Sequence, residues 1–270
     1  MTVLTATIEG IGFWAPGLPT WEAARAFVRD GVLPDAAPSR PSPQVLAPNE
    51  RRRAPDSVAV ALDVAQAACV MAGRDPATLP SVFASTHGDL AITDYMCATL
   101  VDTPASISPT KFHNSVHNAA AGYWTIGVGC MRAATAISAY DATFAQGLLE
   151  AMVQLHAGED AVLVVGYDCV SPGPLAIVSP SQYVLGGALV LSRTPRAGAA
   201  QLNLVLEDGD SADAQVGPLA ARLATNAMAP MLPVFDALAI GATSTTLLAG
   251  SGRVLQLAFA QTLAREPAHA

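Results

Sequence analysis

The first regular pattern in the chain is an alternation of apolar and polar residues over positions 2–13, which predicts a β-strand. Positions 161–168 (AVLVVGYD) form an uninterrupted apolar run of strand length, which is typical of a strand covered by helices on both faces. Further strands are predicted at 81–86, 186–192, 201–208 and 253–260. Because a turn-rich segment joins them, 186–192 and 201–208 are predicted to form an antiparallel hairpin.

Apolar residues recur at helical spacing in longer segments. They predict helices at 21–29, 56–73, 91–100, 116–129, 143–157 and 218–227. Asp56 is the expected N-cap of the second of these helices, and Gly158 is the expected C-cap of the fifth. The proline-rich stretch 30–50 has no period and is expected to be a surface loop. Strands alternating with covering helices predict an α/β layered architecture.

Composition excludes several classes of protein. With 51% hydrophobic and 13% charged residues in 270, the chain can bury a sizeable core, and disorder is not expected. The net charge of −8 argues against binding to a nucleic acid backbone. The sequence contains no long unbroken apolar run and no signal-peptide pattern, so we expect no membrane span and a cytoplasmic location. The four cysteines lack metal-ligand or disulfide spacing, so no metal site is expected.

The most informative stretch is 107–147, in which Asn118, Gly122, Gly129 and Asp141 follow the spacing N-x3-G-x6-G-x11-D. This spacing, with the Ser-Pro pair at 108–109 before it, resembles the β-ketoacyl synthases of the thiolase superfamily, whose nucleophilic cysteine occupies the last position. The segments IEGIGFWAPG and SPSQYVLGGALVLS resemble two further motifs of that family, so the resemblance spans about residues 5–210.

The resemblance implies a thiolase-like layered α/β fold, equivalent to the N-terminal half of a ketosynthase. A mixed sheet covered by helices on both faces is expected. The chain is expected to form a single domain over residues 1–270, with 211–270 as a shortened C-terminal extension.

Two departures from the family determine the expected function. A condensing enzyme needs a thiolate to carry the acyl chain, whereas a carboxylate at position 141 is a weak nucleophile that would give a reactive anhydride. The histidine and lysine motifs of the family's second half are also missing from this chain, and His87 lies upstream of the nucleophile position. The resemblance therefore implies a subunit that does not condense acyl chains by itself. Asp141 is in addition a candidate N-cap for the helix that follows it.

A ketosynthase relative without its nucleophile resembles the chain-length factors of type II polyketide systems, and the shortened form is similar to subunits of aryl polyene and xanthomonadin-type pigment pathways. The resemblance implies a heterodimer with a full-length β-ketoacyl-ACP synthase in polyketide or fatty-acid-like biosynthesis, indirect contact with acyl carrier protein, and no cofactor. The implied acyl-tunnel residues are Ile92, Tyr95 and Met96, with Tyr95 and Met96 as the steric stop. The implied interface residues are Ser108, Pro109, Phe112, His113, His117 and Asn118.

Two other functions remain open from the sequence. The chain could be an independent thioester acyltransferase or β-ketoacyl synthase that uses Cys130 or Asp141 with His113 or His117 as the base. It could also be a scaffold that only stabilises a ketosynthase. A zinc site at His113 and His117 is disfavoured because no cysteine or carboxylate stands at ligand spacing nearby.

Overall fold

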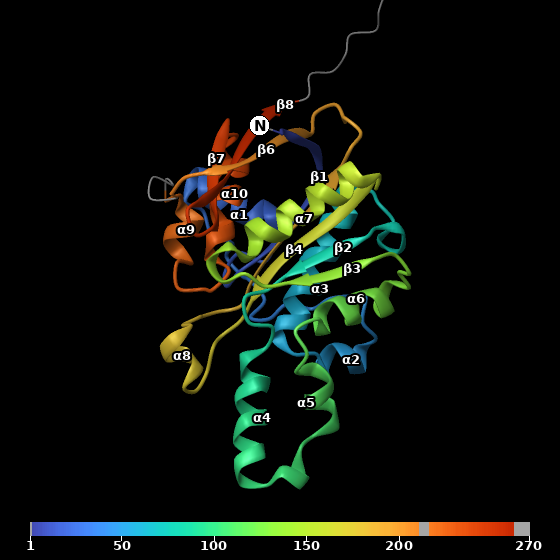
Figure 1. Cartoon of the computed structure of the whole chain (residues 1–270), viewed down its shortest axis with the longest axis vertical. Helices are drawn as coiled ribbons and strands as arrows, with labels where there is room; N and C mark the ends of the chain where they lie inside the picture. Colours follow the sequence, from blue (N-terminus) through green and yellow to red (C-terminus); the bar gives the residue numbers. More distant parts are fainter. Residues whose placement is uncertain (1, 211–215, 262–270) are drawn as a thin grey trace, which may run out of the picture.

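A computed structural model describes residues 2–210 and 216–261, and its centre is one mixed β-sheet (Figure 1). The strands are β1 (Leu4–Trp14), β2 (Ser81–Ala84), β3 (Ala134–Ile137), β4 (Ala161–Asp168), β5 (Leu185–Ser192), β6 (Ala200–Asp208), β7 (Ser244–Gly250) and β8 (Arg253–Gln261). Their order across the sheet is β3-β2-β4-β5-β1-β6-β8-β7. β2 runs parallel to β3 and β4, and the other neighbouring pairs are antiparallel. The mixed sheet expected from the resemblance is confirmed.

Helices cover both faces of the sheet. They are α1 (Trp21–Asp30), α2 (Pro48–Arg53), α3 (Asp56–Ala72), α4 (Leu90–Asp102), α5 (Pro109–Asn114), α6 (Ala119–Val128), α7 (Thr143–Ala157), α8 (Leu175–Val178), α9 (Pro218–Arg222) and α10 (Leu232–Ile240). The side chains of β4 alternate between two cores: Val162 and Val164 pack in the core that contains α1, α7 and α10, while Leu163 and Val165 pack in the core that contains α3 and α6. This two-sided burial explains the uninterrupted apolar run of β4.

The predicted hairpin between β5 and β6 is wrong, because β1 lies between these two strands. Thr7 pairs with Ser192 on the β5 side and with Gln201 on the β6 side. Since both strands run antiparallel to β1, the loop 193–199 carries the chain from one side of β1 to the other. A turn-rich segment between two strands cannot reveal that a strand from the N-terminus separates them.

Close contact between α3 and β1 depends on glycine. A Cβ atom added at Gly12 would lie 2.0 Å from the backbone oxygen of Val64, and one added at Gly10 would lie 2.1 Å from that of Ala68. Only a residue without a side chain permits the helix backbone to approach the strand so closely.

Several predicted boundaries differ from the structure. α3 begins at Asp56 and has Pro55 as its N-cap, so Asp56 does not cap the helix and instead forms an ion pair with Arg40. The predicted loop 30–50 ends in the first turn of α2, which starts at Pro48. The predicted helix 218–227 stops at Arg222, where α9 ends. Within the proposed extension, 211–215 and 262–270 lie outside the described residues, while β7 and β8 continue the same sheet.

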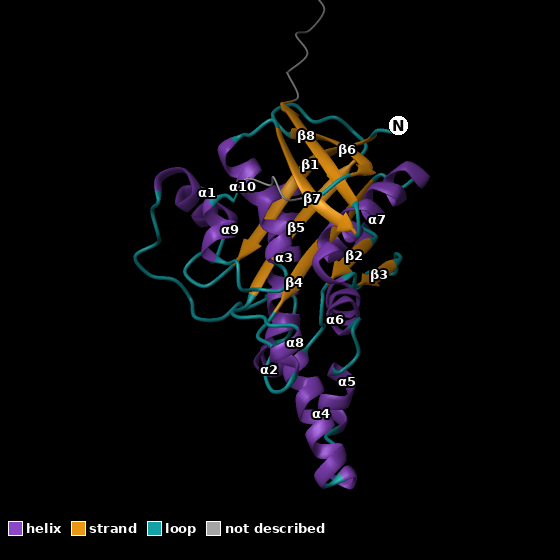
Figure 2. Cartoon of the chain, turned by 60° about the vertical axis from the view of Figure 1, so that its left-hand side comes forward, coloured by secondary structure: helices purple, strands orange, loops and turns teal. Residues whose placement is uncertain are grey.

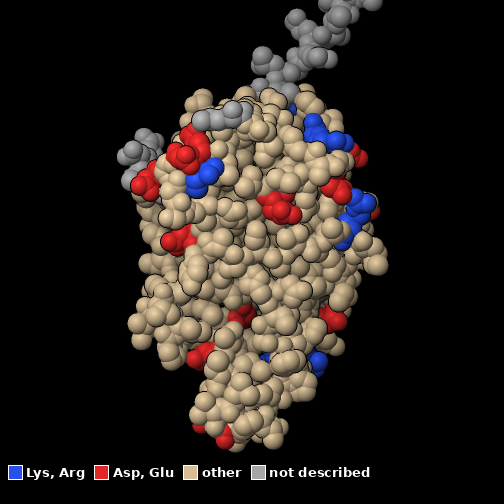
Figure 3. Space-filling view, in the orientation of Figure 1, with Lys and Arg blue, Asp and Glu red and all other residues tan. Residues whose placement is uncertain are grey.

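Helices α4 and α5, with the connection between them, project from the layered body (Figures 1 and 2). We refer to residues 90–114 as the arm. α4 begins at its N-cap Asp89, whose carboxylate accepts a hydrogen bond from the backbone N–H of Ile92. Uncharged residues form most of the visible face of the arm (Figure 3). Its exposed apolar side chains include Val101 (84% exposed) and Phe112 (61% exposed).

Candidate functional site

Asp141 lies in a short 3-10 turn (Tyr140–Ala142) between β3 and α7. The preceding residue, Tyr140, has a φ of 51°, in the left-handed region that non-glycine residues rarely adopt. Asp141 is not the N-cap of α7, as one alternative predicted; that position is Ala142, which has no capping side chain. The Thr143 hydroxyl stabilises the turn instead, accepting from the Ala139 N–H at 2.9 Å and donating to the Tyr140 carbonyl at 2.6 Å.

The side chain of Asp141 is exposed and faces a cavity of about 720 Å³. Among the described residues, no group donates a hydrogen bond to its carboxylate. The cavity is bounded by the turn at 140–141, the loop 178–182 and the segment that follows α9; its polar walls include Thr86, Ser179 and Asn226. We refer to it as the Asp141 cavity.

A buried polar cluster that the sequence analysis did not identify adjoins this cavity. Asp168, at the end of β4, is fully buried and accepts hydrogen bonds from the Ser85 hydroxyl at 2.7 Å and from the backbone N–H groups of Thr86 and His87 at 2.9 and 3.2 Å. His87 Nε2 and the Ser179 hydroxyl share a hydrogen bond of 2.5 Å. The parallel strands β2 and β4 both end at this edge of the sheet, which is where polar groups of α/β folds gather.

Burial is the main cause of the pKa shifts of Asp168 and His87 in this cluster. It raises the pKa of Asp168 and lowers the pKa of His87, although each charge partly offsets the effect on the other. Asp168 accepts from the backbone of His87 and not from its imidazole ring, and His87 Nδ1 has no partner among the described residues. The ring is therefore not oriented by a carboxylate, as it is in a Ser-His-Asp triad. The contacts of this cluster join the β2–α4 loop to loop 178–182.

The residues named for an independent enzyme are not brought together in the described part of the chain. Cys130 is buried after the end of α6, and its thiol donates to the Leu79 carbonyl at 3.4 Å. His117 Nε2–H donates to the Ser85 carbonyl at 2.8 Å, and the His113 ring lies edge-on to the Tyr123 ring. Neither histidine lines the Asp141 cavity or forms a hydrogen bond with Asp141 or Cys130. This geometry provides no nucleophile–base pair from those residues.

The implied tunnel residues lie on α4, in the arm. Ile92 and Met96 are buried, whereas Tyr95 is half-buried. The ammonium group of Lys111, on α5, lies 3.4 Å from the centroid of the Tyr95 ring, a cation–π contact that ties the two helices of the arm together. Ile92 also faces a second cavity at the base of the arm.

The implied interface residues belong to one segment of the chain, which runs from the start of α5 in the arm to the start of α6. Ser108 is the N-cap of α5, and Pro109 is the first residue of that helix. Phe112, His113 and Asn118 are exposed, and His117 is half-buried. These surface residues continue onto α6, where Ile126 is 82% exposed, and onto the adjoining Met131, which is 96% exposed.

A comparison with known protein families shows the family to which the chain belongs. A family model described as β-ketoacyl synthase, N-terminal domain, matches residues 21–252. The chain belongs to this family. A comparison with curated proteins gives no match. Among the described helices of this β-ketoacyl synthase relative, none is long and apolar enough to span a membrane.

Solved structures share the fold of this β-ketoacyl synthase relative. A chain of the complex "Ketosynthase (ApeO) in Complex with its Chain Length Factor (ApeC) from Xenorhabdus doucetiae" is 23% identical, with a TM-score of 0.73 over 94% of this chain and 99% of that chain. A chain of "The ishigamide ketosynthase/chain length factor" is 14% identical, with a TM-score of 0.73 over 96% of this chain and 100% of that one. The thiolase-like ketosynthase fold predicted from the motifs is therefore confirmed.

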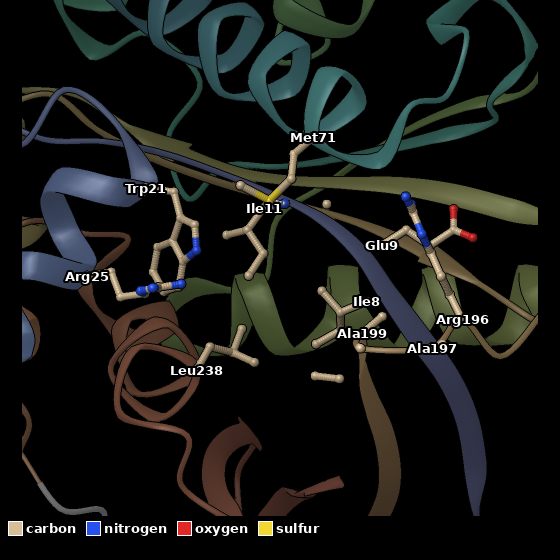
Figure 4. Close-up of a pocket in the computed structure, with 13 residues that line it drawn as sticks. Ile8, Glu9, Ile11, Trp21, Arg25, Met71, Arg196, Ala197, Ala199 and Leu238 are labelled. Carbon is tan, nitrogen blue, oxygen red and sulfur yellow. Dashed lines mark hydrogen bonds between the residues drawn. The ribbon is translucent and has the colours of Figure 1, made fainter. Parts of the chain in front are cut away.

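A separate cavity of about 400 Å³ lies between β1, α1 and the loop 193–199 (Figure 4). Glu9 is among its lining residues, and its carboxylate forms a bidentate ion pair with Arg74, with Nε–Oε2 and Nη2–Oε1 distances of 2.7 and 2.9 Å. Burial raises the pKa of Glu9, but the hydrogen bonds of Arg74 and Ser192 and the charges of Arg74 and Arg196 together lower it by more, so the net shift is downward.

We expect Arg74→Met to lower the free energy of unfolding at neutral pH by about 1–2 kcal/mol, because the Glu9 side chain is only 7% exposed and would lose its partner. Since the pKa of Glu9 is depressed in the folded protein, the stabilisation is fully present above its ordinary pKa and is lost as the pH falls through the depressed value. Urea unfolding across that pH range measures both effects. The control is Arg253→Met, which breaks an exposed pair with Asp208 and should cost less than about 0.5 kcal/mol. Equal losses in the two variants would contradict the argument.

Proposed function

We propose that this chain is a non-catalytic ketosynthase-like partner, a chain-length factor, that pairs with an active β-ketoacyl-ACP synthase and helps to shape its acyl tunnel. The observation that carries the proposal is the position of Asp141. The motif spacing assigns it the place of the family's nucleophile, and it lies at the turn before α7, beside a cavity, with no described imidazole bonded to it. A carboxylate there cannot take over an acyl chain as a thiolate does.

The surface of the molecule supports a protein partner. β3 is the last strand at its edge of the sheet and pairs with β2 alone among the described strands, so its outer N–H and C=O groups are unpaired by sheet bonds. Next to this edge lie the exposed side chains of Ile126 and Met131, and the arm adds Phe112 and Val101. An unpaired strand edge flanked by apolar side chains is well suited to an interface with another subunit.

The structural neighbours support the same type of partner. Two of the similar structures are described as ketosynthases with a chain-length factor. A third is described as "AntDE:AntF (apo): type II PKS acyl-carrier protein in complex with its ketosynthase bound to the hexaketide" (13% identity, TM-score 0.71, over 97% of this chain and 100% of that chain). We infer that the partner here is a full-length ketosynthase in polyketide, aryl polyene or fatty-acid-like biosynthesis, and that acyl carrier protein is contacted indirectly.

Co-expression with a full-length β-ketoacyl-ACP synthase from the same organism tests the proposal. We expect the two chains to co-purify, and condensation of acyl and malonyl carrier thioesters only when both are present. An acyl-thioester probe should leave this chain unlabelled. Condensation by the isolated chain, or a covalent acyl adduct at Asp141 or Cys130, would favour the independent enzyme instead.

Enlarging the implied tunnel stop should change the product. We expect Tyr95→Ala and Met96→Ala, each within the co-expressed pair, to yield products longer by at least one two-carbon extension, because shortening either side chain removes volume from the implied wall. Mass spectrometry of the released chains measures this. Cys97→Ala is the control, since Cys97 is an exposed residue of the same helix. Unchanged product length in both variants would favour a subunit that only stabilises the ketosynthase.

A further inference from the structure

The cavity at the base of the arm has a volume of about 570 Å³. It lies between the start of α3, the two helices of the arm and the segment that follows β4. We refer to it as the arm cavity. Its apolar walls are formed by Pro55, Ala91, Ile92, Cys169, Val170 and Val184. A cavity of this size with mainly aliphatic walls can hold a segment of hydrocarbon chain.

Four of the eight polar side chains that line the arm cavity have partners within the chain, and two others, Arg53 and Thr110, are exposed to water. Arg40 donates to the Asp56 carboxylate at 2.7 Å and to the Ala54 carbonyl at 2.6 Å. Asp89 accepts from the Ser57 hydroxyl at 2.7 Å and from the backbone N–H of Ile92 at 3.0 Å. These groups maintain the wall and have little capacity left for a ligand.

The side chains of Asn114 and Lys111 have no such hydrogen-bond partners among the described residues. Asn114, the last residue of α5, is only 4% exposed and lines the arm cavity, yet its Oδ1 atom is buried and has no hydrogen-bond partner among the described residues. A buried polar atom left without a partner destabilises the fold, and native proteins rarely keep one without a reason. Lys111, which also lines the cavity, contacts the Tyr95 ring, and no described oxygen accepts a hydrogen bond from its ammonium group.

These two side chains define the chemistry of a matching ligand. The buried Asn114 amide oxygen needs a hydrogen-bond donor, whereas the ammonium group of the exposed Lys111 can donate to an acceptor. A methyl group satisfies neither, and a carboxylate only accepts, so it leaves the amide oxygen unpaired. A hydroxyl group donates and accepts, and can therefore satisfy both side chains at the end of an apolar chain.

We infer that the arm cavity binds the far end of an acyl chain and selects one that ends in a hydroxyl group, through Asn114 and Lys111. The inference rests on the proposed function, which supplies the acyl chain, and adds a specificity for its terminal group. It assigns Asn114 and Lys111 a role in binding, whereas Tyr95 and Met96 limit length by their volume.

Three matched probes test the inference: methyl octanoate, its ω-hydroxy derivative and monomethyl octanedioate, which end in a methyl, a hydroxyl and a carboxylate group. Calorimetric titration is carried out on this chain alone and on its complex with the ketosynthase. We expect the hydroxyl-terminated probe to bind about fivefold more tightly than the methyl-terminated one, the difference that one net hydrogen bond provides. The preference should disappear in Asn114→Leu and in Lys111→Met.

Asn203→Leu is the matched control, because Asn203 lies on β6, outside the arm, and its replacement should keep the preference. Asn114→Leu should also melt no lower than the original protein, since an apolar side chain replaces an unpaired amide. If that variant does not fold, Lys111→Met decides the outcome. Equal binding of the hydroxyl and methyl probes, or tightest binding of the carboxylate probe, would overturn the inference. If this chain prefers the hydroxyl probe but forms no complex with the ketosynthase, the proposed function is overturned and the binding preference of the arm cavity stands.

Discussion

Gly12→Val is expected to yield no folded protein. The added Cβ atom would lie 2.0 Å from the backbone oxygen of Val64 and 2.8 Å from its carbonyl carbon, so backbone, and not a flexible side chain, blocks it. β1 pairs with β5 and β6, and α3 packs across it, so separating helix from strand would disrupt the middle of the sheet. Such a displacement costs more than about 5 kcal/mol, comparable with the whole stability of a domain. Soluble yield and far-UV circular dichroism measure the loss.

Gly122→Ala is the appropriate comparison. Gly122 lies within α6, and no described atom beyond the adjacent backbone of its own helix stands within 4 Å of the position that a Cβ would take. Alanine should therefore leave the protein folded and raise its stability by up to about 1 kcal/mol through better helix propensity. A folded Gly12→Val protein with normal stability would contradict the observed spacing of α3 and β1.

The second large effect concerns assembly. We expect Phe112→Asp combined with Ile126→Asp to abolish co-purification with the ketosynthase, with at least about a hundredfold loss of affinity. Both side chains are exposed in the single chain, so the fold should persist, whereas an interface would have to bury two unpaired carboxylates. Pull-down and analytical size-exclusion chromatography measure the result.

Ile240→Asp provides the control for this double variant. Ile240 is an exposed apolar residue at the end of α10, in the layered body and away from the arm (Figure 1). Its replacement should leave the complex intact. If the double variant still co-purified while Ile240→Asp did not, the interface would lie on the α10 side of the molecule.

Local patterns in the sequence predicted the long elements and failed where distant segments meet. Periodicity identified α3, α7 and β4, because each carries a complete pattern within its own residues. The strand β3 was missed because it is a partly exposed edge strand without a buried apolar run, whereas the equally short β2 is fully buried and was predicted. The insertion of β1 between β5 and β6 could not be predicted from local sequence, since its residues pair with residues 172 to 200 positions away along the chain.

In the candidate site, too, local motifs were predicted from the sequence, whereas contacts between distant segments were not. The spacing of Asn118, Gly122 and Gly129 predicted the family and drew attention to Asp141, which the structure places in the turn before α7. The cluster around Asp168 was missed because His87 and Ser179 lie 92 residues apart in sequence. A charged residue at the end of the apolar run of β4 was the one available signal, since a buried carboxylate requires hydrogen-bond donors nearby.

The unpaired edge at β3 has a consequence for how cells must make this protein. An open strand edge beside apolar side chains attracts any other exposed strand, including that of an identical copy. On the proposed function, molecules synthesised in excess over the ketosynthase would therefore be prone to aggregate with one another before a partner arrived. Balanced production of the two polypeptides, for example from adjacent reading frames on one messenger RNA, would protect the cell from such orphan aggregates.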